Sequence, residues 1–303
     1  MYPLRTLLLA STATCLILGS AAWAKEPKAK KEAKEDQPQY VRLVRDDSKQ
    51  PVALEVAIVR FAPMDCSKDS PTVDLVGAVH VADKSYFAEL NKLFEGYEAV
   101  LYELVAPEGS EVPQPGAARG SHPISVLQTA MTGVLDLEYQ LEAIDYSRDN
   151  MVHADMSPEA FAATMKKRGE SFMQVFMRAF GYAMSKQSGQ ASGPSDAQLL
   201  IALFSKDRSL ALKRIMAEQF QDLESSMAAL DGPQGSTLIG ERNKVALGVL
   251  RKQLDDGKKN LAIFYGAGHM ADFAQRLRDD FGLTPINTRW LTAWDLKGQK
   301  GPQ

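Results

Sequence analysis

The chain has 303 residues, of which 45% are hydrophobic, and 35 basic against 38 acidic side chains give it a formal net charge of −3. A slightly acidic balance of this kind predicts neither nucleic acid nor an anionic membrane surface as a partner. The length and the apolar content are enough for one large hydrophobic core.

The first 38 residues are predicted to lie outside the fold. Arg5, the apolar run from Leu7 to Leu18 and the sequence Ala22-Trp23-Ala24 form the pattern of a secretory signal peptide, residues 1–24. Residues 25–38 are charged and poor in apolar side chains, which predicts a disordered linker. We therefore expect an exported protein, periplasmic or extracellular.

No segment reaches the length of about 20 apolar residues that a membrane-spanning helix needs, so no integral membrane segment is expected after signal cleavage. Cleavage would also remove Cys15 and leave Cys66 as the single cysteine. The mature chain is therefore expected to contain no internal disulfide, and its stability has to come from its core.

Residues 39–303 are predicted to form a single domain that begins with β-strands. Tyr40 to Val44 and Val52 to Phe61 are rich in β-favouring residues and are expected to pair as a hairpin. Thr72 to Val76 is a further strand, Tyr86 to Phe94 has the one-sided apolar pattern of a helix, and Glu98 to Val105 is the returning parallel strand. This order predicts a β-α-β unit.

The middle of the chain, residues 121–232, is predicted to be a helical insert. The apolar spacing turns helical from Ile124 to about Leu230, and Ser157-Pro158 is an N-cap followed by a first-turn proline that opens a helix through Lys167. The methionine-rich stretch from Phe172 to Met184 is expected to pack within this insert.

The last part of the chain repeats the α/β pattern. Ser236 is expected to cap a helix that ends near Leu254, Asn260 to Tyr265 is a strand, and Phe273 to Phe281 is a helix. Pro285 to Ala293 is a final strand. The predicted fold is therefore α/β, with a mixed central sheet built from two β-α-β units flanked by helices, and with an inserted α-helical cap.

One short motif occurs in both β-α-β units. Residues 77–83 read GAVHVAD and residues 266–272 read GAGHMAD, each between a strand and a helix. Ligands of open α/β sheets bind outside the carboxyl ends of the strands, so His80 and His269 are expected to meet in one crevice. Gly77 and Gly266 allow a tight turn and a close backbone approach, and we count both as cofactor-binding residues.

Together with Glu103, these histidines resemble the signature of the TraB/GumN/TIKI family, which is two Gly-x-x-His motifs and a glutamate on the strand after the first. Arg242, in Glu241-Arg242-Asn243, matches an arginine on the helix before the second motif. The resemblance extends from about Tyr40 to Trp294, although Ala78 stands where many relatives carry a small hydroxyl. It implies a fold akin to the ChaN and erythromycin-esterase group, and metal-dependent protease activity like that of the animal TIKI members.

The same residues predict this chemistry directly. Two imidazoles and a carboxylate, His80, His269 and Glu103, form a catalytic ligand set for a divalent ion such as Mn, Co or Zn, with one position open for water. Arg242 would then stabilise a developing oxyanion or hold a substrate carboxylate, and Glu241 would serve as its partner or as a general base. The leading hypothesis is an exported hydrolase that cleaves peptide, amide or ester bonds in a peptide or small-molecule substrate.

Each assignment has a structural alternative. In that alternative the histidines are hydrogen-bonded core residues, and Glu103 forms a buried ion pair, for example with Arg242. For Arg242 itself, the alternative is a place on a solvated, charged helix face. Asp83 and Asp272 are expected to be helix N-caps. His153-Ala154-Asp155 lies in the insert, and we consider a role for it in supporting the metal ligands. At the level of function, the alternatives are a non-catalytic protein that binds a metal, haem or peptide, and an interaction protein that uses the methionine-rich insert.

Overall fold

The computed structural model describes residues 39–298, except for residues 66, 68, 108, 111–134, 172–199, 203 and 232–235, and it describes no side chains for residues 220–231. The described residues belong to one compact unit, Pro38–Gln303. The predicted signal peptide and linker, Cys66 and the methionine-rich stretch lie outside the described residues. None of the helices in the described part of the chain is long and apolar enough to cross a membrane.

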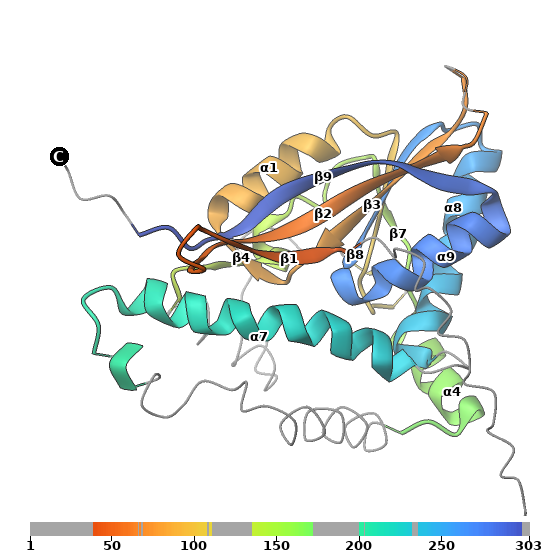
Figure 1. Ribbon diagram of the computed structural model, residues 1–303. Coiled ribbons are helices and arrows are strands. Elements are labelled where there is room, and N and C mark those ends of the chain that lie inside the picture. Colours follow the sequence, from red (N-terminus) through yellow and green to blue (C-terminus); the bar gives the residue numbers. More distant parts are fainter. Residues whose placement is uncertain are drawn as a thin grey trace, which may run out of the picture. The chain divides into compact units, whose positions relative to one another are not determined.

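A seven-stranded mixed sheet forms the centre of the Pro38–Gln303 unit, with the order β1-β2-β3-β8-β5-β7 and with β9 paired to β2 (Figure 1). Strands β3, β8, β5 and β7 are parallel to one another, whereas β1, β3 and β9 are antiparallel to β2. The prediction of an α/β fold with a mixed sheet is therefore confirmed. The strands are β1 (Val41–Arg45), β2 (Pro51–Pro63), β3 (Thr72–Ala78), β5 (Ala99–Tyr102), β7 (Met151–His153), β8 (Asn260–Gly266) and β9 (Leu283–Asp295).

Strand β8 lies between the two strands of the first β-α-β unit. It is paired in parallel with β3 on one side and with β5 on the other. Leu261, Ile263 and Tyr265 face one side of the sheet, and Ala262 and Phe264 face the other side, all of them buried. Such a strand reads as a continuous apolar run because both faces of a parallel sheet are covered.

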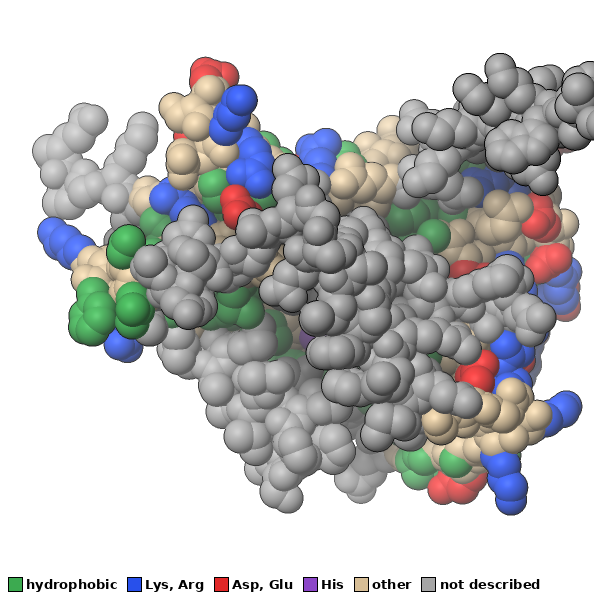
Figure 2. Space-filling model, turned by 60° about the horizontal axis from the view of Figure 1, so that its bottom comes forward, with side chains coloured by type: hydrophobic (Ala, Val, Ile, Leu, Met, Phe, Trp, Pro, Cys, Tyr) green, Lys and Arg blue, Asp and Glu red, His purple; other side chains and the backbone are tan. Residues whose placement is uncertain are grey.

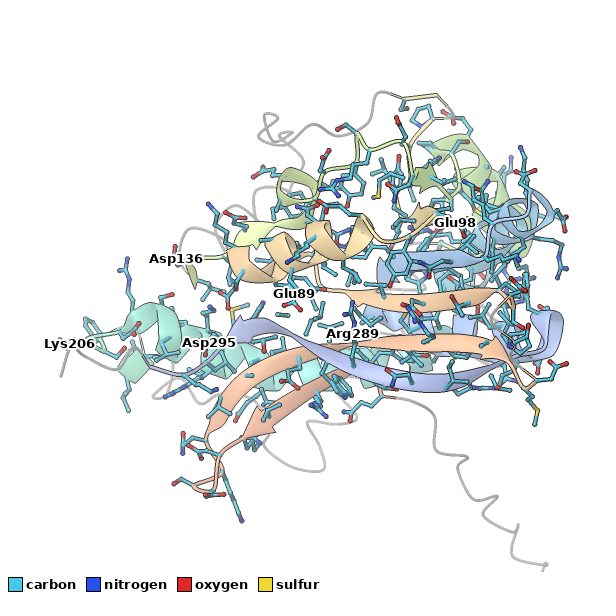
Figure 3. All side chains as sticks on the ribbon, turned by 90° about the horizontal axis from the view of Figure 1, so that it is seen from above. Glu89, Glu98, Asp136, Lys206, Arg289 and Asp295 are labelled. Carbon is cyan, nitrogen blue, oxygen red and sulfur yellow. The ribbon has the colours of Figure 1, made fainter. Side chains whose placement is uncertain are left out.

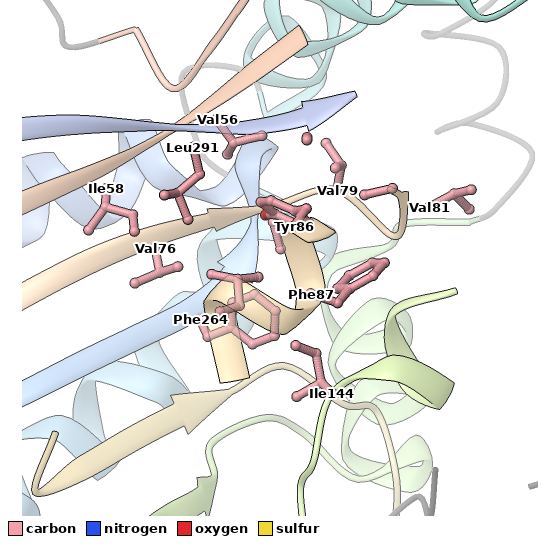
Figure 4. Packing of buried hydrophobic residues seen from close by; sticks show 14 of the residues in the cluster. Val56, Ile58, Val76, Val79, Val81, Tyr86, Phe87, Ile144, Phe264 and Leu291 are labelled. Carbon is pink, nitrogen blue, oxygen red and sulfur yellow. The ribbon is translucent and has the colours of Figure 1, made fainter. Parts of the chain in front are cut away.

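Helices cover both faces of this sheet. Helix α1 (Lys84–Phe94) packs Tyr86 and Phe87 into a core that includes Phe264 (Figure 4). Helices α8 (Arg242–Asp255) and α9 (Met270–Phe281) pack on the opposite face, where Leu250 and Leu277 belong to a second core. The alternation of side chains along β3 and β8 supplies both cores, because successive residues of a strand point to opposite faces.

The antiparallel part of the sheet contains the predicted hairpin and a last strand that is longer than predicted. β1 and β2 form the expected hairpin. β9 is longer than the predicted strand from Pro285 to Ala293, because it pairs with β2 along almost the whole of that strand. Trp294 is therefore inside the strand, where it is fully buried and donates a hydrogen bond from Nε1 to the Val81 oxygen at 2.7 Å.

The middle of the chain is helical only in part. The described residues include the helices α3 (Gln140–Ala143), α4 (Pro158–Arg168) and α7 (Arg208–Asp231), and Ser157 Oγ accepts a hydrogen bond from the Ala160 N–H as predicted. However, β6 (Glu138–Tyr139) pairs with β4 (Val81–Ala82), and β7 joins the central sheet. The predicted helical insert at about residues 121–232 therefore also contains two short strands, which the sequence did not indicate because strands of two or three residues show no periodicity.

Two predicted N-caps have other roles. Asp83 precedes α1, but its carboxylate accepts hydrogen bonds from Lys213 Nζ and from the Asp295 N–H, both at 2.6 Å. Asp272 lies within the first turn of α9, where its Oδ2 accepts from Asn243 Nδ2. Both carboxylates connect separate parts of the fold instead of capping a helix.

The predicted cap at Ser236 is confirmed, because its Oγ accepts a hydrogen bond from the Ile239 N–H. The first turn after it is the π-helix η1 (Thr237–Glu241), and the regular α-helix α8 follows. This turn brings Arg242 and Asn243 to the amino-terminal end of α8, where both are buried.

Candidate active site

Four neighbouring parallel strands each bring one polar residue to the same edge of the sheet. His80 follows β3, His269 follows β8 through the short 3-10 helix η2 (Ala267–His269), Glu103 follows β5, and Asp155 follows β7. The carboxyl ends of parallel strands form the usual ligand crevice of open α/β folds. The prediction that the two motif histidines meet at one place therefore follows from the strand order.

Gly266 lies at the point where these residues meet. A Cβ atom at this position would lie 3.3 Å from Glu103 Oε2, 3.8 Å from His269 Cδ2 and 3.9 Å from His80 Nε2. The Gly266 N–H also donates to Glu103 Oε2 at 2.7 Å. The φ angle of Gly266 is −49°, which any residue can adopt, so it is the shared space that requires glycine here.

The orientation of the His269 ring is fixed by Asn243. Asn243 Nδ2 donates to the His269 oxygen at 3.1 Å and to Asp272 Oδ2 at 2.8 Å, so its Oδ1 is the acceptor at 2.7 Å from His269 Nδ1. His269 therefore carries its proton on Nδ1 and has a lone pair on Nε2. Burial lowers the pKa of His269, which keeps the imidazole neutral. Its Nε2 lies 3.7 Å from Glu103 Oε1.

The His80 ring is held in a similar way from another element. Its Nδ1 lies 3.0 Å from Gln140 Oε1, and Gln140 Nε2 donates to the Tyr146 hydroxyl at 2.9 Å. The Gln140 N–H also donates to the His80 oxygen at 2.8 Å. His80 is exposed whereas His269 is buried, and Figure 2 shows histidine surface near the middle of the face drawn there. Both rings therefore use Nδ1 for a protein contact, and the Nε2 of each lies close to Glu103 or Gly266.

Glu103, Arg242 and Asp155 form one buried ionic network. Arg242 Nη2 donates to Glu103 Oε1 at 2.7 Å and to Asp155 Oδ2 at 2.5 Å, and Arg242 Nε donates to Asp155 Oδ1 at 2.9 Å. The side chains of Asp155, Arg242 and Glu103 are 0%, 7% and 13% exposed. Two carboxylates share one guanidinium, so the network carries a net charge of −1.

The electrostatics of this network keep Glu103 ionised. Burial alone would raise the pKa of its carboxyl, but the electrostatic interactions with His269, Arg242 and His80 and the hydrogen bond from the Gly266 N–H lower the pKa to about 2. Burial would lower the pKa of Arg242, and the hydrogen bonds and charges of Asp155 and Glu103 outweigh burial and raise it. The guanidinium and the Glu103 carboxylate are therefore both charged at neutral pH.

The donor set fits a divalent ion in its chemistry. Metal sites commonly orient their imidazole ligands through a hydrogen bond at the other ring nitrogen. Here the Nδ1 atoms of His80 and His269 are both held by protein groups, next to the buried ionic network of Glu103, Arg242 and Asp155. Among the residues that the structure describes, no group of three or more His, Cys, Asp or Glu side chains is arranged so that it could hold a metal ion. The roles of His80, Glu103 and His269 as metal ligands therefore remain a proposal that is based on their convergence.

Two predicted site residues are not brought to this centre. Glu241 Oε1 accepts from Lys244 Nζ at 2.7 Å and from Arg168 Nη1 at 3.2 Å, so Glu241 is not the partner of Arg242. A Cβ atom at Gly77 would lie 3.0 Å from Val56 Cγ1 and 3.4 Å from the Ala57 oxygen of β2. Gly77 therefore serves close packing within the sheet and does not face the shared space near Gly266.

Other residues of the site had little or no signal in the sequence. Asp155 has the clearest one, because it follows a strand as Glu103 does, but β7 is too short to be recognised. Asn243 is adjacent to Arg242, and no spacing rule marks it as the partner of a histidine 26 positions away. Gln140 reaches His80 from the first residue of α3, directly after β6.

Comparison with known proteins found no matching family, no matching curated protein and no matching solved structure. The function is therefore argued from the residues of this site.

Proposed function

We propose that this protein is an exported, divalent-metal-dependent hydrolase that cleaves peptide, amide or ester bonds. His80, Glu103 and His269 are the proposed metal ligands, and the observation that carries the proposal is their convergence at Gly266 from three different strand ends. The resemblance to the TraB/GumN/TIKI family favours a peptide substrate. Export is proposed from the signal-peptide pattern of residues 1–24.

The chain's own residues have distinct parts in this proposal. Asn243 and Gln140 hold the two imidazoles through Nδ1, so that both Nε2 atoms are available as ligands. A divalent ion bound there would polarise a substrate carbonyl and lower the pKa of water to about 7. Gly266 leaves room for the ligands and fixes one Glu103 oxygen through its N–H.

Arg242 has a supporting and an electrophilic part. Its Nε and Nη2 hold Asp155 and Glu103, which positions the proposed carboxylate ligand. Its Nη1 makes no hydrogen bond to any residue within the described part of the chain. In the proposal this Nη1 donates to the substrate oxygen on which negative charge develops, as pre-positioned donors do in acyl transfer.

One observation favours a second candidate, a protein that binds a metal ion, haem or peptide without turnover. Hydrolysis requires a group that accepts a proton from water, and the predicted base Glu241 is bound to Arg168 and Lys244. Glu103 and Asp155 both accept hydrogen bonds from Arg242. The pKa of Glu103 is about 2, which is too low for a group that has to take a proton from water at neutral pH. Such a centre would keep its ligand and release no product.

Metal titration and a peptide-cleavage assay on the same preparations would test both candidates. The purified protein is titrated with Mn²⁺, Co²⁺ and Zn²⁺ by calorimetry and incubated with a peptide library that is read by mass spectrometry. His80→Ala and His269→Ala should each weaken metal binding at least tenfold and abolish cleavage. Gln275→Ala, on the exposed side of α9, is the matched control and should behave as the unmodified protein.

The outcomes separate the candidates. Cleavage that persists in both histidine variants, with unchanged circular dichroism, would refute the hydrolase proposal. Metal binding that depends on both histidines, together with no cleavage in the whole library, would favour the binding protein. Metal binding that is unaffected in both variants would remove the proposed ligand set.

A further inference from the structure

A cavity lies at the end of the parallel strands that is opposite to the candidate active site. Its volume is about 630 Å³, within the range of small-molecule sites, and it lies beside the carboxyl-terminal end of α1. Its walls come from β2, β3, β8 and β9, from the last turn of α1 and from the residues that follow α1. The lining residues used below are Ile58, Arg60, Asp74, Leu93, Tyr97 and Arg289, with Ile286 at its edge.

This cavity is separate from the candidate active site. Asp74 is near the beginning of β3 and His80 follows its end, so six residues of extended chain, about 20 Å, separate the two. A ligand in this cavity therefore does not touch His80, Glu103 or His269.

The charges within the cavity leave one cation without a counter-charge. The Arg60 guanidinium binds both oxygens of the buried Asp74, at 2.7 and 2.8 Å, and the Tyr97 hydroxyl donates to Asp74 Oδ2 at 2.6 Å. Burial, followed by the charge of Asp74, raises the pKa of Tyr97, so this hydroxyl keeps its proton. Asp74 and Arg60 thus compensate each other.

Arg289 is the remaining charge. It lies on β9 directly opposite Ile58 of β2, and Figure 3 labels its side chain on that strand. Facing residues of an antiparallel pair point to the same side of the sheet, so Arg289 lies on the side that carries α1. Arg289 makes no ion pair or hydrogen bond with any residue that the structure describes.

Apolar groups lie next to this cation. Ile58 and Leu93 form part of the wall, and Ile286, which also lines the cavity, is 50% exposed. A ligand that fills this cavity would cover apolar surface while a negative group meets Arg289. Burial of the apolar part stabilises binding, and the guanidinium selects a planar carboxylate through paired N–H donors.

We infer that this cavity binds a small carboxylate that carries a short apolar chain, with Arg289 as the carboxylate contact. Such a ligand would be a short-chain fatty acid or an aryl carboxylate. The inference does not depend on the proposed hydrolase activity.

Calorimetric titration of the purified protein with sodium hexanoate tests the inference, with neutral hexanamide as the matched probe. Arg289→Gln should weaken hexanoate binding about tenfold or more, the loss expected for one charge-assisted hydrogen bond. Ile286→Asp should also weaken it, because a negative charge at the edge repels the carboxylate. Arg208→Gln removes an exposed arginine of α7 with the same change of charge, and it should bind hexanoate as the unmodified protein does.

Four results would overturn the inference. They are the absence of saturable hexanoate binding, equal weakening by Arg208→Gln, equally tight binding of hexanamide, and loss of hexanoate binding in His269→Ala. The last result would place the ligand at the other end of β3. Circular dichroism of each variant shows whether a loss of binding comes from a loss of fold.

Discussion

Replacement of Arg242 by Met tests the buried network directly. Met keeps an apolar stem but removes three hydrogen bonds, at 2.9 and 2.5 Å to Asp155 and at 2.7 Å to Glu103. Removing one partner of a buried ionic contact costs about 3–5 kcal/mol, because the remaining charge stays buried without compensation. We expect Arg242→Met to lower the free energy of unfolding by about this amount at pH 7, as measured by urea denaturation with circular dichroism.

The same variant has a predicted pH dependence. The folded-state pKa of Glu103 is about 2, below the ordinary value of 4.5, so its contribution to stability is present above pH 4.5 and is lost as the pH falls toward 2. This difference in pKa corresponds to about 3 kcal/mol. Without Arg242 the pKa of Glu103 rises. The difference in the free energy of unfolding between the unmodified protein and Arg242→Met should therefore become smaller as the pH is lowered from 7 to 3.

A double variant is the control for this reasoning. Arg242→Met combined with Asp155→Leu removes a buried cation and a buried anion together, and it should be less destabilised than Arg242→Met alone. Two results would refute the view that this arginine compensates two buried carboxylates. One is a decrease in the free energy of unfolding of less than about 1 kcal/mol for Arg242→Met at pH 7. The other is a difference from the unmodified protein that is the same at pH 3 as at pH 7.

Two further predictions concern the orientation of His269 and the packing within the sheet. Asn243→Leu removes the acceptor of the His269 Nδ1 proton, and calorimetry should show Co²⁺ binding about 10–100-fold weaker; unchanged affinity would contradict the assigned role of Asn243. Gly77→Ala places a Cβ 3.0 Å from Val56 Cγ1 and should cost about 1–3 kcal/mol in thermal or urea unfolding. Gly248→Ala, in helix α8 with no atom within 4 Å, should instead stabilise by about 0.5–1 kcal/mol, and equal effects at both glycines would contradict the packing argument.

The parts of the site that could be predicted come from local signals. A strand followed by Gly-x-x-His appears in residues 77–80 and again in residues 266–269, and each copy is placed at a strand end as expected. Ser157 and Ser236 cap helices because a serine before a helix can accept a hydrogen bond from the first turn. These signals extend over a few residues and do not depend on the rest of the fold.

The parts that could not be predicted depend on contacts between distant segments. Asp155 comes to Arg242 because the three-residue strand β7 pairs with β5, a pairing that leaves no periodic pattern in the sequence. Asp272 looks like a helix cap by position, yet it holds the amide of Asn243 from another helix. The sequence shows Glu241 and Arg242 as neighbours, but on a helix successive residues point in different directions, so only Arg242 reaches Glu103.

The place of β8 in the middle of the parallel strands has a consequence for how the chain acquires its structure. Residues up to 259 contain β3 and β5 but not the strand that joins them, so both strands keep an unpaired edge until the last part of the chain is available. Contacts over such sequence separations slow folding. The central sheet of this polypeptide can therefore be completed only after its C-terminal segment has been synthesised.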